Sequence, residues 1–201
     1  IFPTQFDRQW ITVGWACEGV ALAWLFRRVP HPGLRLVAVG LLVAAFARLA
    51  LNPAVLHYHP RAATPIWNWF LYAYGLTTLC LFAGARLLAP PRQLVLGRNV
   101  VPLLCTLGTV LAFLLLNIEI ADYFSTGTTL TFQFSGSFGR DMTYSLAWAL
   151  FALVVLAAGV KARSSGARWA GLVLLTVTLL KLAFRDLWQL GGLYRIGSFL
   201  G

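Results

Sequence analysis

Residues 100–118, VVPLLCTLGTVLAFLLLNI, form a run of 19 residues without a charged side chain. As a helix this run would be about 28 Å long, which matches the thickness of the hydrocarbon core of a bilayer. It is followed by Glu119, Asp122 and Tyr123, a change expected where a helix leaves hydrocarbon through the membrane interface. We therefore predict a transmembrane helix here. Because lipid cannot satisfy backbone hydrogen-bonding groups, the other apolar runs must also be helices that pack beside it.

The composition of the whole chain is that of a membrane protein. Hydrophobic residues make up 59% of the 201 residues and charged residues 11%, whereas soluble globular proteins carry about 25% charged residues. The charges stand in short clusters between apolar runs, which does not fit amphipathic helices around a soluble core. We predict an all-α fold, a polytopic transmembrane helix bundle in which residues 1–201 form a single helical region. Six full crossings are expected at residues 10–26, 34–51, 66–88, 100–118, 142–160 and 169–184, and the start of a seventh at 194–201.

Two of the connections are longer than simple turns. Residues 52–65 lie between prolines and contain two histidines, so we expect a small cap over the membrane surface without helix or strand. Residues 125–139 alternate Leu130, Phe132 and Phe134 with polar side chains. This alternation predicts a short surface strand or an amphipathic lid.

The basic residues indicate how the chain is oriented. If the crossings alternate, one side of the membrane receives nine basic residues and no acid, and the other receives seven basic and five acidic residues. Lys and Arg are retained on the cytoplasmic side, so the acid-free side is predicted to be cytoplasmic. The net charge of +10 therefore reflects orientation, and we expect no nucleic-acid partner. The nine residues are Arg27, Arg28, Arg35, Arg86, Arg92, Arg98, Lys161, Arg163 and Arg168.

Glu18 stands at the middle of the first predicted crossing, where a charged side chain costs about 2.5 to 3.5 kcal/mol. One interpretation is a contact with an ion, a proton or a substrate. The other is a protonated or hydrogen-bonded glutamate that pins helices together. Arg48 and Lys181 lie nearer the outer ends of their helices, and each either reaches towards Glu18 or extends to the interface.

Further charge pairs are expected near the C-terminus. Lys181 and Arg185 are four residues apart and share a helix face, so an acid from another helix should lie between them. We predict that Lys181 pairs with Glu18 and that Asp186 pairs with Arg195. These pairs would lock the sixth and following helices to the first and close a polar outer cavity.

Three acids are predicted at the outer boundary of the membrane. Glu119 and Asp122 are three residues apart on one helical face, and Asp141 begins the next helix after the loop. Paired carboxylates serve glycoside chemistry or cation binding, although polar helix ends look the same in sequence. His57 and His59 would complete a metal set with these acids, but their spacing in a loop is weak evidence, and we expect no metal.

The remaining candidate chemistry is sparse. Cys17, Cys80 and Cys105 fall inside apolar runs and form no CxxC pair, so they are interpreted as small packing residues. The chain contains no GxSxG, HExxH, P-loop or Rossmann motif. We therefore expect no cofactor and assign no catalytic residue.

Both ends of the chain resemble a known family. The segments FDRQWITVGWACEGVALAWLFRR, residues 6–28, and KLAFRDLWQLGGLYRIGSFLG, residues 181–201, are similar to bacterial polytopic membrane proteins of the domain-of-unknown-function family two-three-three-nine. The resemblance implies a longer protein with further crossings on both sides of this chain, in a bacterial inner membrane. It supplies no activity, substrate or catalytic residue. The most specific positions are Lys181, Asp186, Leu187, Leu190, Arg195, Ser198 and Phe199.

Three functional hypotheses follow from these observations. The first is a transport, channel or envelope-assembly component with a polar cavity in the outer half of the bundle. The second is a membrane-embedded enzyme that acts on lipid-linked or envelope glycans, with Glu119, Asp122 or Asp141 as acid and base. The third is a passive scaffold. In each case the expected partners are the bilayer, other helices of the same longer chain, and other membrane or envelope proteins.

Overall fold

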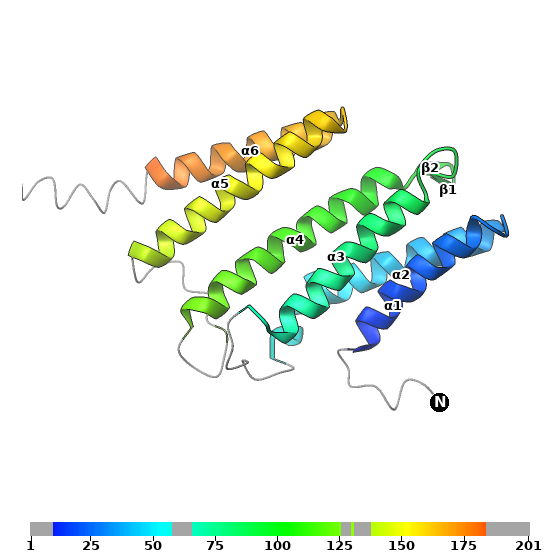
Figure 1. The fold of residues 1–201 in the computed structure, drawn as a ribbon, viewed down its shortest axis with the longest axis horizontal. Helices are drawn as coiled ribbons and strands as arrows, with labels where there is room; N and C mark the ends of the chain where they lie inside the picture. The colour runs from blue at the N-terminus through cyan, green and yellow to red at the C-terminus, as the bar shows by residue number, and fades with distance from the viewer. Residues whose placement is uncertain (1–9, 58–65, 126–129, 131–137, 184–201) are drawn as a thin grey trace, which may run out of the picture. The chain divides into compact units, whose positions relative to one another are not determined.

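A computed structural model describes residues 10–57, 66–125, 130 and 138–183 of the chain (Figure 1). Its elements are α1 (Trp10–Phe26), α2 (Pro32–Ala50), the 3₁₀ helix η2 (Pro53–His57), α3 (Trp69–Leu87), β1 (Leu94–Val95), β2 (Arg98–Asn99), α4 (Val101–Phe124), α5 (Phe138–Lys161) and α6 (Ser165–Lys181). The prediction of an all-α protein is confirmed.

Among the helices in the described part of the chain, four are long and apolar enough to cross a membrane. They are α2, α3, α4 and residues Gly139–Lys161 of α5. The helices α1 and α6 have 17 residues each, so the six predicted crossings are not all confirmed. The predicted start of a seventh crossing lies outside the described residues.

The helix boundaries follow from local capping chemistry. Pro32 opens α2 because its ring suits the first turn, and the His31 side chain accepts a hydrogen bond from the Gly33 amide. Asn68 caps α3 in the same way, so this helix begins three residues later than the predicted crossing. At the other end, α4 continues through Glu119 to Phe124, so its two acids belong to the last turns of the helix.

The connections between the helices differ from the predicted ones in two places. Residues 53–57 form η2, so the expected cap without helix is wrong for these five residues, whose first member is a proline suited to a helical turn. An unpredicted hairpin, β1 and β2, joins α3 to α4 through Leu96 and Gly97, both at positive φ (49° and 76°). Such a two-residue turn matches the twist of the flanking strands. The predicted strand or lid at 125–139 falls almost entirely outside the described residues.

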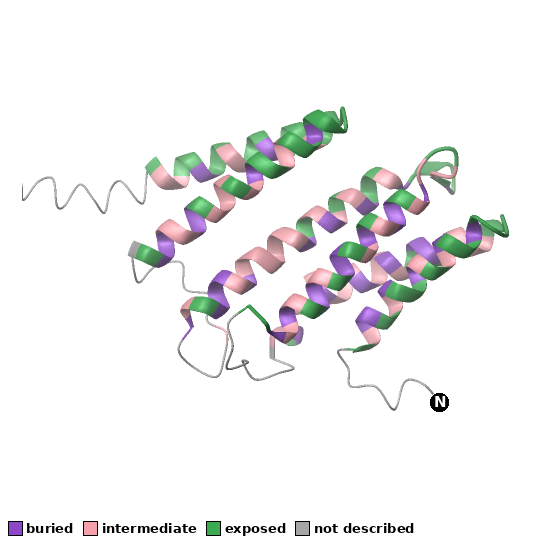
Figure 2. Ribbon diagram, in the orientation of Figure 1, coloured by how far each residue is buried: buried purple, intermediate pink, exposed green. Residues whose placement is uncertain are grey.

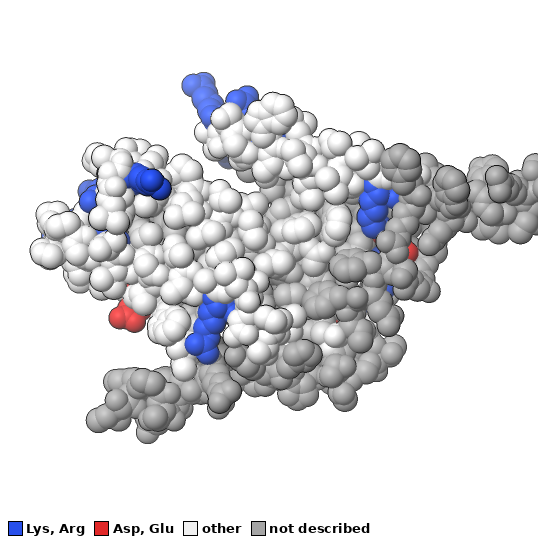
Figure 3. All heavy atoms as spheres, turned by 180° about the vertical axis from the view of Figure 1, so that it is seen from behind, with Lys and Arg blue, Asp and Glu red and all other residues white. Residues whose placement is uncertain are grey.

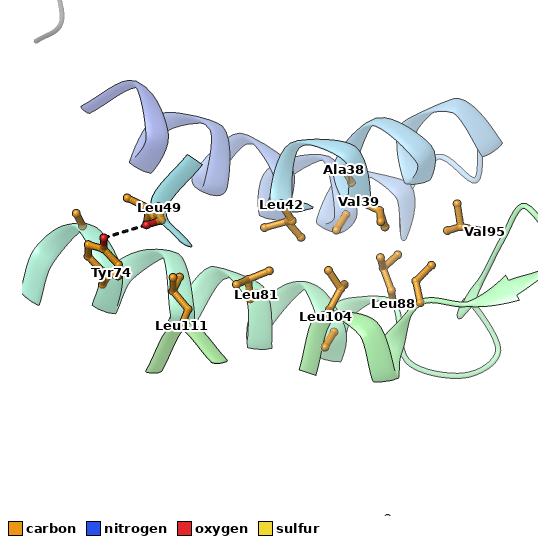
Figure 4. Close-up of a cluster of buried hydrophobic side chains, with 14 of the residues drawn as sticks. Ala38, Val39, Leu42, Leu49, Tyr74, Leu81, Leu88, Val95, Leu104 and Leu111 are labelled. Atoms are coloured by element: carbon orange, nitrogen blue, oxygen red, sulfur yellow. Dashed lines mark hydrogen bonds between the residues drawn. The ribbon is translucent and has the colours of Figure 1, made fainter. Parts of the chain in front are cut away.

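The chain divides into two compact units, residues 1–131 and residues 132–201. In the first unit, leucines from three helices meet in an apolar core. They are Leu42 of α2, Leu81 of α3, and Leu104 and Leu111 of α4 (Figure 4). The Tyr74 hydroxyl donates a hydrogen bond to the Leu49 carbonyl at 3.0 Å and ties α3 to the end of α2.

The second unit is a helical hairpin of α5 and α6. The backbones of the two helices come close together at two glycines. A Cβ added to Gly159 would lie only 2.7 Å from the Arg168 amide nitrogen. A Cβ on Gly171 would likewise lie 2.9 Å from the Leu156 nitrogen. Small residues of this kind allow close approach of helices in lipid. Exposed residues recur along the helices of both units (Figure 2). Many of them are large and apolar, as expected for surfaces that face lipid.

Candidate functional site

The most elaborate polar cluster of the first unit joins the start of α3 to the end of α4. Asn68 Nδ2 donates one hydrogen bond to Glu119 Oε2 at 3.0 Å and another to Asp122 Oδ2 at 3.1 Å. Its Oδ1 accepts from the Leu71 amide at 2.8 Å, so the side chain cannot turn without losing the cap of α3. We call Asn68, Glu119 and Asp122 the amide–acid cluster.

The amide–acid cluster is shielded from solvent. Asp122 is 1% exposed and Asn68 3% exposed. Glu119 is partly buried, and its second oxygen, Oε1, is buried without a hydrogen-bond partner in the described part of the chain. The two oxygens held by Asn68 Nδ2 lie within about 6 Å of each other, a range at which one carboxylate opposes the ionisation of the other.

A second polar cluster lies in the helical hairpin, where α6 ends beside the start of α5. Lys181 Nζ donates hydrogen bonds to the Asp141 carbonyl at 3.1 Å and to Ser145 Oγ at 2.6 Å. The Ser145 hydroxyl also donates to the Asp141 carbonyl at 3.1 Å. Asp141 is 2% exposed, and its Oδ1 is buried without a hydrogen-bond partner among the residues that the structure describes. We call Asp141, Ser145 and Lys181 the lysine clamp.

Glu18 belongs to neither cluster. It is exposed at the middle of α1, on the outside of the first unit. The Arg48 guanidinium lies over the Trp15 ring, with Cζ 5.5 Å from the ring centroid. Trp15 precedes Glu18 by about one turn of α1. The predicted pairing of Glu18 with Lys181 would join the two units and stays a prediction.

Several predicted site residues fall outside the description. His59, Arg185, Asp186 and Arg195 lie in the segments 58–65 and 184–201. Within the described ranges, no group of three His, Cys, Asp or Glu side chains is placed to hold a metal ion.

Sequence reasoning missed the residue that organises the amide–acid cluster. Asn68 falls inside the predicted crossing 66–88, between Trp67 and Trp69. An asparagine just ahead of an apolar run is the usual signal of a helix N-cap, and it would have marked the start of α3. Its second role, as a donor to two acids 51 and 54 residues away, leaves no local trace.

Among the described residues on the face drawn in Figure 3, charged side chains are sparse and stand apart from one another on an uncharged surface. Two arginines near helix ends place their guanidinium groups over aromatic rings of α1. Arg28 lies over Trp24 at 5.6 Å, and Arg35 lies over Phe26 at 5.2 Å and donates to the Arg92 carbonyl. Together with the apolar exposed helices, this arrangement defines an integral membrane protein built from helices.

The family follows from comparison with known proteins. The model of the family described as Predicted membrane protein (DUF2339) matches residues 50–201, so the chain belongs to this family. The matched range includes the C-terminal segment 181–201, which resembles the family in sequence. It does not include the N-terminal segment 6–28. No curated protein and no solved structure matches the chain.

Proposed function

We propose that the protein is a transport component of a bacterial inner membrane and that the amide–acid cluster binds and releases a proton. The observation that carries this proposal is one amide nitrogen, Asn68 Nδ2, donating to two carboxylates at 3.0 and 3.1 Å. Placing an ionisable side chain within a membrane-spanning helix costs free energy, so such residues tend to serve a function. Acids within spanning helices form the proton relays of pumps and transporters.

The electrostatics favour one shared proton. With Asp122 almost fully buried and Glu119 beside it, ionising both carboxylates would place two negative charges together where water cannot screen them. The amide of Asn68 favours an ionised oxygen on each acid but supplies no positive charge. The buried Glu119 Oε1 is the atom best placed to carry the proton, since it has no hydrogen-bond donor within the described ranges.

The proposed topology places the cluster at the outer side of the membrane. If α1 and α6 cross the membrane together with the four longer helices, the crossings alternate. The start of α3 and the end of α4 then lie opposite the acid-free turns at residues 27–35, 86–98 and 161–168. A proton site at that side would face the envelope space, as expected for a component driven by the proton gradient.

Infrared difference spectroscopy of the protein in bilayers tests the proton site. Between about pH 5 and pH 9 we expect a protonated carboxyl band that disappears in Glu119→Gln and shifts in Asn68→Ala. The band should persist in Asp141→Asn, which alters an acid of the other unit. An unchanged titrating band in both Glu119→Gln and Asp122→Asn would refute the proton site.

A flux measurement tests the transport role separately. Proteoliposomes with an internal pH dye should acidify under an imposed proton gradient, and Glu119→Gln should remove this uptake while Asp141→Asn keeps it. If the carboxyl band titrates as expected but wild-type liposomes take up no protons above empty ones, the cluster binds a proton and the transport role is wrong.

A further inference from the structure

Arginines lie at one end of the first unit, where α1 ends, α2 begins and the hairpin of β1 and β2 joins α3 to α4 (Figure 1). We call this end, residues 26–36 and 86–101, the arginine end. It contains no acidic residue. The amide–acid cluster lies at the opposite ends of α3 and α4, and its carboxylates therefore do not compensate these cations. The six arginines are Arg27, Arg28, Arg35, Arg86, Arg92 and Arg98.

Arg35 is the arginine whose surroundings point to a ligand. Among the described residues it makes one hydrogen bond, a long one of 3.5 Å from Nη1 to the Arg92 carbonyl. Its Nε is buried without a hydrogen-bond partner in the same part of the chain. Its Cζ lies over the Phe26 ring, 5.2 Å from the centroid. Because a guanidinium carries five N–H donors in one plane, this partly buried cation calls for a further acceptor.

The depth of Arg35 favours a lipid headgroup as that acceptor. Arg35 is in the first turn of α2, Pro32–Ala50, which is long and apolar enough to span a membrane. It therefore lies about 5 Å inside one end of a spanning helix, at the level where hydrocarbon gives way to headgroups. Phospholipid headgroups carry a phosphate, and a guanidinium binds phosphate through paired N–H donors.

The charge around Arg35 favours an anionic headgroup over a zwitterionic one. β1 contacts α2, and its partner strand β2 carries Arg98, so further positive charge lies beside the start of α2. A zwitterionic headgroup brings a cation of its own, which these arginines repel. The turn of the helical hairpin, residues 161–168, holds three basic residues and no acid, and Asp141 lies at the other end of that hairpin.

We propose that Arg35 binds the phosphate of an anionic phospholipid at the arginine end of the first unit. The phosphate oxygens accept hydrogen bonds from Arg35 Nε and from its terminal nitrogens, and the surrounding arginines select a headgroup with net negative charge. Since Arg35 contacts the end of α1 and the connection between α3 and α4, the bound lipid supports the place where these elements meet. The site is separate from the amide–acid cluster and does not depend on its proton.

Native mass spectrometry of the protein released from detergent micelles tests this site. We expect phosphatidylglycerol to be retained about tenfold more than phosphatidylcholine, because the site selects an anionic headgroup. Arg35→Gln should lower the retention of phosphatidylglycerol by about tenfold, since it removes the paired donors and the charge. Arg35→Lys should also lose most of the retention, because an ammonium keeps the charge but lacks the planar fork.

Arg86→Gln is the matched control, because it removes one charge from an exposed arginine at the same end. It should keep the retention within about twofold, since an exposed charge is screened. Equal losses in Arg35→Gln and Arg86→Gln would replace the site with diffuse attraction and overturn the proposal. Inorganic phosphate or polyglutamate that displaces the lipid at equal charge concentration would also overturn it, in favour of a free phosphate or an acidic protein.

Thermal unfolding keeps the proposal testable if the Arg35 variants fold poorly. Phosphatidylglycerol should raise the unfolding temperature of the wild-type protein and of Arg86→Gln, whereas phosphatidylcholine should not, because a ligand that binds the folded state stabilises it. A wild-type protein that responds equally to both lipids, or to neither, would overturn the proposal without any Arg35 variant.

Discussion

The two units hold their helices together by different means. In the first unit, leucines of α2, α3 and α4 interlock in a continuous apolar core, and Gly84 of α3 receives Leu42 of α2. In the second unit, α5 and α6 share contacts at two glycines and the lysine clamp, while most of their large apolar side chains are exposed.

The difference reflects what lipid does and does not contribute. Lipid tails are as apolar as leucine, so burying an apolar side chain between helices gains less in a membrane than in water. Two helices alone then depend on close packing and on interhelical hydrogen bonds. The second unit should therefore be more sensitive to single substitutions at its contact points than the first.

The largest effect is expected at Gly171. A leucine there would press against backbone atoms, the Leu156 nitrogen at 2.9 Å and the Ala152 carbonyl oxygen at 3.0 Å, which cannot rotate away. We expect Gly171→Leu to destabilise the helical hairpin by about 3 kcal/mol, at the upper end of overpacking effects. Reversible unfolding in mixed micelles would measure it.

Gly166→Leu is the matched control on the same helix, because a Cβ at Gly166 meets nothing within 4 Å. It should change the free energy of unfolding by less than about 0.5 kcal/mol. Equal losses in both variants would mean that the glycine contact does not hold the hairpin, and the contrast between the units would fail.

In the first unit, the largest loss is expected from Asn68→Ala. The substitution removes the cap of α3 and leaves two carboxylates without their shared donor, which together should cost about 2 kcal/mol. Asn99→Ala is the control, since Asn99 Oδ1 accepts a single hydrogen bond, from the Val101 amide, at an exposed position. Thermal unfolding of the two variants should rank them in this order, and equal shifts would contradict a bridging role for Asn68.

Part of this contrast was accessible from sequence. Apolar run length predicted the helices well, because the bilayer imposes one period and one length on every segment that spans it. Glu119 and Asp122 were predicted to share a face from their spacing alone, since both lie on one helix. The partners Asn68 and Ser145 were not predicted, because contacts between helices depend on rotations and crossing points that hydropathy does not encode.

A smaller effect should come from the lysine clamp. Lys181→Met keeps most of the side-chain length but removes the donors to Ser145 Oγ and the Asp141 carbonyl, at an expected cost of about 1 kcal/mol. A double-mutant cycle with Ser145→Ala would isolate the shared part of this cost. If the two losses simply add, Lys181 and Ser145 do not interact and glycine packing alone holds the second unit.

The smallest expected change in stability comes from a disulfide that tests how α1 packs in the first unit. It can be formed in the protein without a substitution. The Cys17 and Cys80 thiols are neighbours where α1 packs against α3. Mild oxidation in membranes should therefore join them, with the loss of two free thiols, while Cys105 of α4 stays reactive toward a membrane-permeant maleimide. Replacing Cys80 with Ser should leave Cys17 free and abolish the cross-link. Because the two thiols are already neighbours in the folded bundle, the disulfide should hardly change the unfolding temperature. Cross-linking of Cys80 to Cys105 in place of Cys17 would mean that α1 does not pack against α3. In that case the first unit would resemble the second in depending on a few contacts.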